Sequence, residues 1–217
     1  MRAARGLFVS FEGIDGSGKS TQAHLLAEHL RAGGADPVLT REPGGSPGAE
    51  QIRRLLVEGA PGRWSAETEI LLFTAARRDH LERTIAPALA AGHIVVTDRF
   101  ADSTRVYQAA ARPEAGRDLR ALVDRLHAEM IGTEPDLTLV IDMPPERALA
   151  RGLARRSGED RYEEMGLAFQ HRLRAGYRAL ADEAPGRVRL IDGDRAAEAV
   201  AADVAAAVEA ASAAIAR

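Results

Sequence analysis

The residues of this chain that are best suited to do chemistry lie at positions 13–20, which read Gly-Ile-Asp-Gly-Ser-Gly-Lys-Ser. This spacing matches G-x-x-x-x-G-K-[ST], the P-loop pattern that binds nucleotide phosphates. Lys19 is the only lysine in the chain, since every other cationic residue among the 29 Lys and Arg is arginine. A lysine ammonium is a compact charge on a flexible stem, which a planar guanidinium does not reproduce. The pattern therefore predicts a phosphate site that depends on lysine at position 19.

The sequence on both sides of this loop favours a P-loop over a plain glycine-rich turn. Residues 7–11 predict a β-strand before it, and residues 22–30 predict a helix after it. Glycines let backbone N–H groups turn toward an anion, and the helix adds the positive end of its dipole. The hydroxyl of Ser20 is the expected ligand for Mg²⁺.

Composition limits the classes of protein that this chain can represent. Its 217 residues suit one α/β domain with a large core, and its net charge of −3 argues against a general nucleic-acid binder. It contains no cysteine, which excludes disulfides and thiolate metal sites. Residues 1–6 precede an apolar run of only five residues, which predicts neither a signal peptide nor a membrane span. We expect a cytoplasmic protein with no nucleic-acid or membrane partner.

Apolar β-branched runs alternate with helical patterns along the chain, which predicts βαβ units and a parallel sheet. The expected strands are Leu7–Glu12, Pro37–Arg41, Ile94–Asp98, Leu137–Asp142 and Val188–Asp192. The expected helices span about 19–33, 48–58, 66–91, 116–131, 145–156, 162–183 and 195–216. The prediction is an α/β three-layer fold of the P-loop NTPase type, a central five-stranded parallel sheet flanked by helices. Residues 1–217 form a single domain in this interpretation.

Four of the five expected strands end in charged groups, namely Glu12, the segment 41–45, the segment 98–100 and Asp142. Because ligands of parallel sheets bind at the carboxyl ends of the strands, these groups are expected to ring a phosphate site. The carboxylate of Asp98 would then face Mg²⁺ or a water bound to it, and Arg99 would neutralise a phosphate. The alternative for each group is a solvated loop.

Phe73 and Arg77 lie four residues apart in an expected helix and therefore share a face. This pair suits a base stacked on the ring and a phosphate held by the guanidinium. Periodicity alone favours the alternative, a core phenylalanine beside a surface arginine.

Arginines are dense between positions 148 and 178, and a loop signal at 157–160 interrupts them. A mobile basic lid over about 150–162 is the functional interpretation. An exposed charged helix is the alternative, and we favour it for Arg172 and Arg174.

Together these segments resemble one family closely, the bacterial thymidylate kinases among the nucleoside monophosphate kinases. The resemblance runs nearly end to end, through Phe11–Thr21, Thr40–Gly45, Leu72–Arg78, Asp98–Phe100 continuing by Ser103–Thr104 to Tyr107–Gln108, and Asp160–Glu163. The Arg-Glu-Pro-Gly-Gly and Asp-Arg-aromatic segments in this order are far more specific than the P-loop alone. The resemblance implies that ATP phosphorylates dTMP, with Mg²⁺ as cofactor, in a homodimer.

The resemblance also implies an ATP site and catalytic groups. The implied ATP-binding residues are Gly13, Ile14, Asp15, Gly16, Ser17, Gly18, Lys19, Ser20, Thr21, Arg155 and Asp192. The implied metal ligands are Ser20 and Asp98. The implied catalytic residues are Lys19, Asp15, Arg99 and Arg161.

For the acceptor, the resemblance implies that Arg53, Arg77 and Arg99 clamp the dTMP phosphate and that Phe73 stacks on thymine. Thr104 and Gln108 match positions that hydrogen-bond the pyrimidine edge. Tyr107 matches an aromatic that crowds the sugar 2′ position, Asp15 lies near the sugar 3′-hydroxyl, and Glu42-Pro43 matches a sharp turn with a cis peptide.

The sequence departs from some relatives inside the P-loop, where the human-type members place an arginine and this chain has Gly16. The arginine-rich lid is therefore expected to supply the catalytic cation, with Arg161 as first choice and Arg155 and Arg156 behind it. Phe100 replaces a more frequent Tyr or His, and Arg105 is unusual beside the pyrimidine contacts.

Two other functions stay open at this point. A related kinase for a deoxynucleoside would phosphorylate a nucleoside rather than its monophosphate, although three arginines around the acceptor favour the monophosphate. A nucleotide-dependent switch is the second alternative. Guanine-specific switches carry Asn-Lys-x-Asp, which a chain with its only lysine at position 19 cannot contain.

Replacement of Lys19 tests the P-loop assignment. Lys19→Ala is expected to abolish turnover without unfolding the protein, because the side chain serves the ligand rather than the core. Lys19→Arg should also be severely impaired, since a guanidinium keeps the charge but not its shape. Steady-state kcat checks this, with circular dichroism as the control for folding. A Lys19→Arg enzyme with near-normal kcat would contradict the requirement for a compact charge.

Overall fold

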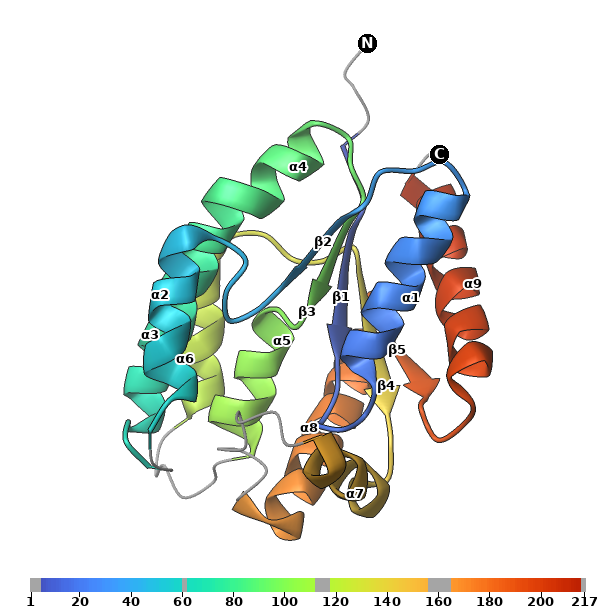
Figure 1. Cartoon of the computed structure of the whole chain (residues 1–217). Coiled ribbons are helices and arrows are strands. Elements are labelled where there is room, and N and C mark those ends of the chain that lie inside the picture. The colour runs from blue at the N-terminus through green and yellow to red at the C-terminus, as the bar shows by residue number, and fades with distance from the viewer. Residues whose placement is uncertain (1–4, 60–61, 112–117, 156–164, 216–217) are drawn as a thin grey trace.

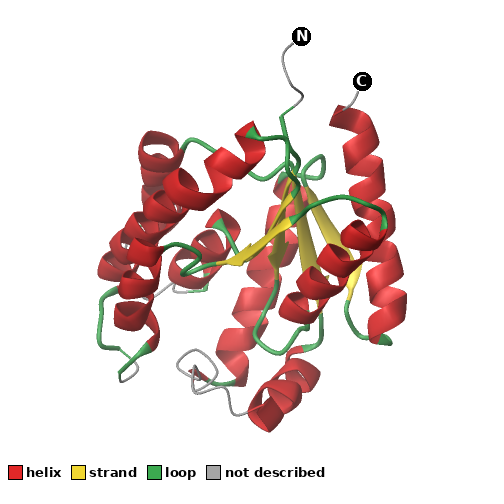
Figure 2. Cartoon of the chain, turned by 45° about the horizontal axis from the view of Figure 1, so that its top comes forward, coloured by secondary structure: helices red, strands yellow, loops and turns green. Residues whose placement is uncertain are grey.

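The structure is a computed structural model of the chain, and it describes residues 5–59, 62–111, 118–155 and 165–215. Helices lie on both faces of a central sheet, so the molecule has three layers (Figures 1 and 2). Helices α1 (Lys19–Ala32) and α9 (Ala197–Ile215) cover one face of the sheet, and helices between α3 (Ala66–His80) and α8 (Leu167–Glu183) gather over the other (Figure 1). The expected three-layer architecture is confirmed.

The elements follow the predicted alternation of strands and helices. The strands are β1 (Phe8–Glu12), β2 (Val38–Arg41), β3 (Val95–Asp98), β4 (Leu137–Asp142) and β5 (Val188–Asp192). The α-helices are α1 (Lys19–Ala32), α2 (Pro47–Val57), α3 (Ala66–His80), α4 (Ala86–Ala90), α5 (Ala101–Thr104), α6 (Leu119–Leu126), α7 (Pro145–Arg155), α8 (Leu167–Glu183) and α9 (Ala197–Ile215). The π-helical segments are η1 (Leu81–Ile85), η2 (Arg105–Ala110) and η4 (His127–Ile131).

Within the described residues, five strands form one parallel sheet in the order β2-β3-β1-β4-β5. The central strand β1 pairs with β3 through Phe11 and Asp98 and with β4 through Glu12 and Val140. This register aligns the carboxyl ends of β1, β2 and β3, because Arg41 also pairs with Asp98. The residues that follow these three strands therefore start from one edge of the sheet.

Alternation of side chains along β1 divides the core between the two faces. Val9 and Phe11 pack with α1 and with Val200, Val204 and Val208 of α9. Phe8 points the other way and joins the cluster formed by η1, α4, α5 and η4. The last helix thus docks on the sheet through its three valines.

The largest departure from prediction is the helical run over residues 101–110, formed by α5 and η2, where no helix is predicted. Helix prediction relies on one apolar stripe, and this run has none, because polar residues on several of its sides are buried against other protein groups. These residues are Asp102, Ser103, Thr104, Arg105 and Gln108. The expected helix 66–91 is one run interrupted by the π-helical turn η1, and the expected helix 162–183 begins at Leu167 in the described part.

Phe100 and Arg105, the two residues that depart from the family pattern, make contacts inside the protein rather than in the pocket. Phe100 is fully buried and packs edge-on against Phe8, with ring centres 4.9 Å apart. Arg105 points away from the pocket and donates to Asp102 at 2.8 Å and to Glu134 at 2.6 Å. Arg105 therefore ties α5 and η2 to the segment before β4.

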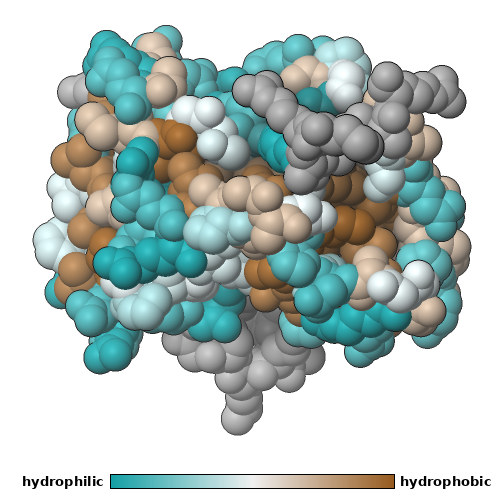
Figure 3. All heavy atoms as spheres, turned by 90° about the horizontal axis from the view of Figure 1, so that it is seen from above, coloured by the Kyte–Doolittle hydropathy of each residue, from teal (hydrophilic) through white to brown (hydrophobic). Residues whose placement is uncertain are grey.

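The surface at the end of the molecule where the strands begin carries both hydrophobic and hydrophilic residues. Hydrophobic residues gather toward the middle of this end, and hydrophilic residues occupy much of its rim (Figure 3). Every helix in the described residues is too short or too polar to cross a lipid bilayer.

Candidate active site

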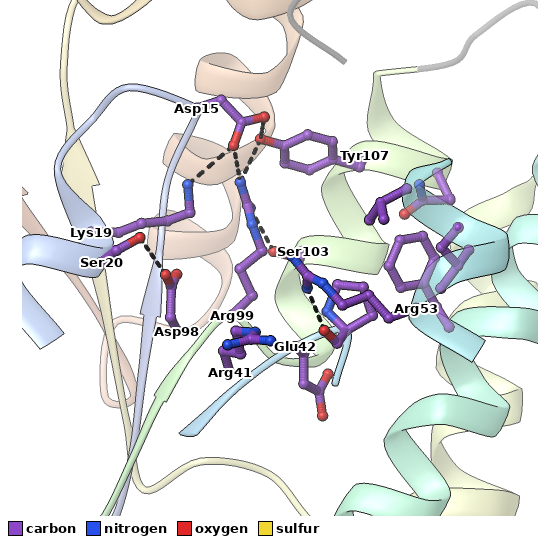
Figure 4. A pocket seen from close by; sticks show the side chains of 15 residues that line it. Asp15, Lys19, Ser20, Arg41, Glu42, Arg53, Asp98, Arg99, Ser103 and Tyr107 are labelled. Carbon is purple, nitrogen blue, oxygen red and sulfur yellow. Dashed lines mark hydrogen bonds and ion pairs between the residues drawn. The ribbon is translucent and has the colours of Figure 1, made fainter. Parts of the chain in front are cut away.

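A pocket opens at the edge of the sheet where β1, β2 and β3 end (Figure 4). Its walls come from the loop after β1, the start of α1, the loop after β2, and α2, α3, α5 and η2. The lining residues are Asp15, Lys19, Ser20, Arg41, Glu42, Pro43, Arg53, Leu56, Val57, Phe73, Asp98, Arg99, Ser103, Tyr107 and Gln108. Most of the residues predicted to bind the acceptor thus meet in one cavity with Asp15, Lys19 and Ser20 of the P-loop.

Two glycines of the P-loop are required by close approach of the backbone. Gly13 has a φ of 136°, and a Cβ there would lie 2.7 Å from the carbonyl oxygen of Ile141. Gly16 has a φ of 79°, and a Cβ there would lie 1.9 Å from the carbonyl oxygen of Ala148. Both positions need glycine, so this backbone has no room for the P-loop arginine of the human-type members.

Asp15 joins the two sides of the pocket (Figure 4). Its Oδ1 accepts hydrogen bonds from Lys19 Nζ at 3.2 Å and from Arg99 at 2.6 Å, and its Oδ2 accepts one from the Tyr107 hydroxyl at 3.1 Å. Burial alone raises the pKa of Asp15, but Lys19 and Arg99 outweigh burial and hold this pKa well below its usual range. One carboxylate therefore holds two cations side by side.

Arg99 adopts an unusual backbone conformation. Its φ is 74°, the only positive value among the described residues other than glycine, and such a conformation costs on the order of 1–3 kcal/mol. The side chain donates to Ser103 Oγ at 2.9 Å and to the Tyr107 hydroxyl at 3.0 Å, and its guanidinium lies 4.7 Å from the centre of the Tyr107 ring. These contacts fix the direction in which Arg99 enters the pocket.

Glu12 lies beneath Arg99 and is completely buried. Its Oε1 accepts the backbone N–H of Phe100 at 2.8 Å and of Ser103 at 3.2 Å. Its Oε2 accepts the hydroxyls of Ser103 at 2.6 Å and Tyr177 at 2.9 Å. Both hydroxyls also accept from Arg99 Nη1, at 2.9 Å and 3.3 Å. Glu12 thus supports Arg99 from behind.

The expected ring of charged strand ends is therefore only half right. The groups after β2 and β3 line the pocket, but Glu12 is buried under it. Asp142, after β4, accepts from Arg174 at 2.7 Å and from Arg178 at 2.8 Å and does not line the pocket. Arg172 and Arg174 both lie in α8, as the charged-helix alternative predicts. Arg172 is exposed and donates to a backbone carbonyl, whereas Arg174 is half-buried and paired with Asp142.

Ser20 and Asp98 meet as the predicted metal pair. The Ser20 hydroxyl donates to Asp98 Oδ2, and Asp98 Oδ1 is buried with no hydrogen-bond partner among the described groups. No cluster of three or more His, Cys, Asp or Glu side chains suited to a metal occurs in the described residues. Mg²⁺ is usually held by one or two carboxylates together with substrate phosphates. The pair fits Mg²⁺ bound jointly with a nucleotide.

Glu42 forms the floor of the opposite side of the pocket. Its Oε2 accepts from Arg77 Nε at 2.8 Å, and its Oε1 lies 3.1 Å from His80 Nδ1. The peptide bond between Glu42 and Pro43 is cis, as the resemblance implies. Arg53 donates to the carbonyl of Pro43 and lines the pocket.

Phe73 and Arg77 differ in their exposure to the pocket. Phe73 is half-buried and lines it, so its ring is available to a ligand. Arg77 is only 3% exposed and is not among the lining residues, and it donates to the Phe100 carbonyl and to Thr104 Oγ1, both at 3.1 Å. The alternative of a surface arginine is wrong, and the expected direct clamp on the acceptor phosphate has no support from this position.

Of the other residues predicted to contact a nucleotide, some line the pocket and some do not. Tyr107 and Gln108 line the pocket, whereas Thr104 is buried behind it against Arg77. Asp192 is exposed at the end of β5 and does not line the pocket, but a Cβ on the adjacent Gly193 would lie 3.5 Å from the carbonyl oxygen of Ser17. This loop therefore lies beside the P-loop.

Thr21 is exposed near the start of α1, outside the pocket lining. Residue 155 ends α7, but its side chain, Arg156, Arg161 and most of the predicted lid lie outside the described residues.

Comparison with known proteins identifies the family. The family model described as thymidylate kinase matches residues 11–204. The chain is 72% identical over 199 residues to "Thymidylate kinase" of Dinoroseobacter shibae, covering 92% of this chain and 94% of that one. It is 67% identical to "Thymidylate kinase" of Ruegeria pomeroyi, covering 92% of each chain.

The chain belongs to the thymidylate kinase family. The crystal structure of thymidylate kinase from Ehrlichia chaffeensis superposes with a TM-score of 0.75 at 34% identity, over 94% of this chain and 99% of that one. As a thymidylate kinase, the chain is a phosphotransferase that phosphorylates dTMP to dTDP with ATP.

Local sequence patterns did not point to several supporting residues, chiefly Glu12 in its buried role, Glu69, Ser103 and Tyr177. Glu12 precedes the P-loop at the end of an apolar strand, and a carboxylate within a buried strand signals a buried polar network. Tyr177 lies 165 residues from Glu12, and nothing local in the sequence connects them.

Replacement of Glu12 by Gln tests the buried network. Burial and the nearby charge of Asp102 raise the pKa of Glu12 from 4.5 to about 7, against the effect of Arg99. The folded state then keeps a proton that the unfolded state loses above pH 4.5, so this group lowers the free energy of unfolding as pH rises toward 7. The loss amounts to up to about 3 kcal/mol.

Glu12→Gln cannot titrate and should lose that dependence. We expect the unfolding free energy of the wild type to fall relative to the variant between pH 4.5 and 7.5, as measured by urea denaturation at several pH values. A difference between the two proteins that stays constant over this range would contradict the raised pKa.

Proposed function

We propose that this pocket binds dTMP with its phosphate toward Arg99 and its base on Phe73, beside ATP phosphates held by the P-loop. The observation that carries the proposal is the shared contact of Lys19 and Arg99 with Asp15. Lys19 belongs to the nucleotide loop, whereas Arg99 belongs to the acceptor side. Two phosphates that must react with each other need cations at adjacent points, and these two cations are adjacent.

In this proposal catalysis consists of positioning and charge neutralisation. Lys19 and the P-loop N–H groups stabilise charge on the transferring phosphoryl group. Arg53 and Arg99 hold the dTMP phosphate, which would otherwise be repelled by ATP. A phosphate oxygen is already a nucleophile, so no strong general base is required.

We further propose that Ser20 and Asp98 hold Mg²⁺ with the nucleotide. The support is the buried Asp98 Oδ1, which has no hydrogen-bond partner among the described groups and suits a cation. When bound, Mg²⁺ neutralises charge on the ATP phosphates. Asp98 keeps the Ser20 hydroxyl oriented, because that hydroxyl donates to its other oxygen.

For the base, we propose stacking on Phe73 and a hydrogen bond at the edge from Gln108, with the Thr104–Arg77 pair behind the base site. The bond between Arg77 and Thr104 supports a place for Arg77 behind the base site rather than at the acceptor phosphate. Tyr107 is proposed at the sugar, since its hydroxyl bonds Asp15.

The lid over about 150–162 and its cation stay predictions from the sequence. We propose Arg161 as the lid cation, with Arg155 and Arg156 as alternatives, and Asp192 near the adenine of ATP. The close approach of Gly193 to Ser17 supports the second assignment. The predicted cytoplasmic location and the lack of a nucleic-acid partner also stay predictions.

We also propose a homodimer that uses the side of the molecule formed by α3 and η4. Leu71 of α3 is 58% exposed and Met130 of η4 is 47% exposed. Arg78 joins the two elements by donating to the Met130 carbonyl at 2.7 Å. Apolar side chains of this size on neighbouring elements suit a partner surface. Light scattering of the wild type against a Leu71→Glu variant tests it.

The assay that tests the acceptor is ADP release from ATP with each nucleoside monophosphate in turn, and with thymidine. Turnover that rises sharply with dTMP and not with thymidine is expected. Turnover with thymidine but not dTMP would favour a nucleoside kinase, and ATP hydrolysis that ignores both would favour a switch.

Replacement of Phe73 by Ala tests the base site. Stacking of a base on an aromatic ring is worth roughly 1–3 kcal/mol, so KM for dTMP should rise about 5- to 150-fold while KM for ATP changes little. Phe8→Ala is a control, because Phe8 is fully buried at the start of β1, at the opposite end of the strand from the pocket, and should lower stability without selecting one substrate. Equal rises in both KM values for Phe73→Ala would make Phe73 structural.

A further inference from the structure

Glu42 is an acidic residue in the wall of a pocket that is proposed to bind a phosphate. It follows β2 and is only 6% exposed, although it lines the pocket. Its carboxylate points away from Arg53, one of the two arginines proposed to hold the acceptor phosphate (Figure 4). A carboxylate that turned toward the pocket would repel the phosphate and compete with it for the same cations. The direction of this side chain therefore matters for acceptor binding.

Two donors from α3 take the two oxygens of the Glu42 carboxylate. Arg77 Nε donates to Oε2 at 2.8 Å, and His80 Nδ1 lies 3.1 Å from Oε1. Arg77 is 3% exposed, and His80 is completely buried. Because an ionised carboxylate only accepts hydrogen bonds, Nδ1 is the ring nitrogen that carries the hydrogen. His80 is therefore a donor to Glu42 from behind the pocket.

The other ring nitrogen of His80 fixes the orientation of the imidazole. Its Nε2 lies 2.7 Å from the hydroxyl of Thr40 in β2, which donates to it when the ring is neutral. The backbone of Gly45 covers this pair, since a Cβ at Gly45 would lie 2.4 Å from both His80 Nε2 and Thr40 Oγ1. The imidazole is thus held between β2 and the loop that follows it.

Residues on either side of His80 bind the backbone of the same loop. The carboxylate of Asp79 accepts from the Ser46 hydroxyl at 2.6 Å, at the start of α2. The hydroxyl of Thr84 donates to the Gly45 carbonyl at 2.8 Å. These contacts place the loop, but within the described part of the chain the hydrogen bonds to the Glu42 carboxylate come from the two α3 donors above. The path of the loop and the direction of the carboxylate therefore have separate supports.

We propose that His80 is a positioning residue for acceptor binding, which together with Arg77 keeps the charge of Glu42 away from the phosphate of dTMP. His80 does not line the pocket. If it did not donate, Oε1 of Glu42 would be a buried anionic oxygen without its hydrogen bond, and the carboxylate would turn toward the cations of the pocket. The acceptor phosphate would then meet a negative charge, whereas the base and the sugar would not. The proposal rests on the phosphate site at Arg53 and Arg99 described above.

The test compares two substitutions of His80, each of which keeps one of its two contacts. Asparagine places its amide nitrogen where histidine has Nδ1 and keeps the donor to Glu42. Glutamine places its amide where histidine has Nε2 and keeps the contact with Thr40. We expect His80→Gln to raise KM for dTMP by about 3- to 10-fold, the size of one hydrogen bond, with little change in kcat or in KM for ATP. His80→Asn should keep KM for dTMP close to that of the wild type.

Thymidine provides the readout that separates the phosphate from the base and the sugar. It lacks the phosphate, so its Ki as a competitor of dTMP should be the same in the wild type and in both His80 variants. Urea denaturation should show that both variants lose free energy of unfolding, because both remove a ring from a buried site. A purely structural role would therefore not separate the two variants.

Two further variants connect the effect to the charge of Glu42. In a Glu42→Gln background there is no charge to hold, so His80→Gln should not raise KM for dTMP further. If His80→Gln does not fold, Thr40→Val gives the same test, because it removes the hydroxyl that orients the ring. It should raise KM for dTMP by a smaller factor and leave the Ki of thymidine unchanged.

An unchanged KM for dTMP in His80→Gln, an equal rise in His80→Asn, or a parallel rise in the Ki of thymidine would overturn the proposal and leave His80 as a structural residue. A rise that persists in the Glu42→Gln background would also overturn it. Failure of the phosphate site itself has a different signature, because Arg53→Ala would then leave KM for dTMP unchanged, whatever the His80 variants do.

Discussion

The active site depends on one electrostatic interaction, the contact of the Asp15 carboxylate with two cations. Lys19 comes from the nucleotide loop and Arg99 from the end of β3, and neither could lie so close to the other without an anion between them. Two like charges at this separation repel strongly in a partly buried site. Asp15 removes that cost in the absence of ligand, and phosphates supply more negative charge when they bind.

Hydrogen bonds behind the pocket hold Arg99 in the position from which it contacts Asp15. The left-handed backbone at Arg99 is held by its N–H, which donates to Phe11 O at 2.9 Å, and by its carbonyl, which accepts from the Thr97 hydroxyl at 2.9 Å. Glu12 holds the segment that follows, because it accepts the N–H groups of Phe100 and Ser103 and the hydroxyl of Tyr177. The network links β1, α5 and α8, so packing far from the pocket sets the direction of the arginine within it.

On the acceptor side of the pocket, buried hydrogen bonds also hold the elements in place, and here each bond pairs an ionisable side chain with a neutral one. Polar side chains of α3 hold polar side chains of α5 and η2, and the half-buried Phe73 lies between the two bonds. Buried polar groups of this kind are expensive unless each is paired. These bonds therefore stabilise the packing of α3 against α5 and η2 behind the ring of Phe73.

The sequence by itself determined the parallel α/β architecture and the nucleotide loop. Apolar strands and glycine spacing are local patterns, and the backbone bears them out at Gly13 and Gly16, where no Cβ fits. Local pattern failed at α5 and η2, because a helix buried among polar partners shows no apolar stripe. The rule that ligands bind at strand ends also put Glu12 in the pocket, where it does not lie. The side chains of a strand alternate between two faces, and the sequence does not show which face lies toward the pocket. Tertiary structure alone decided that Glu12 lies under Arg99, because the partners that hold it come from segments up to 165 residues away.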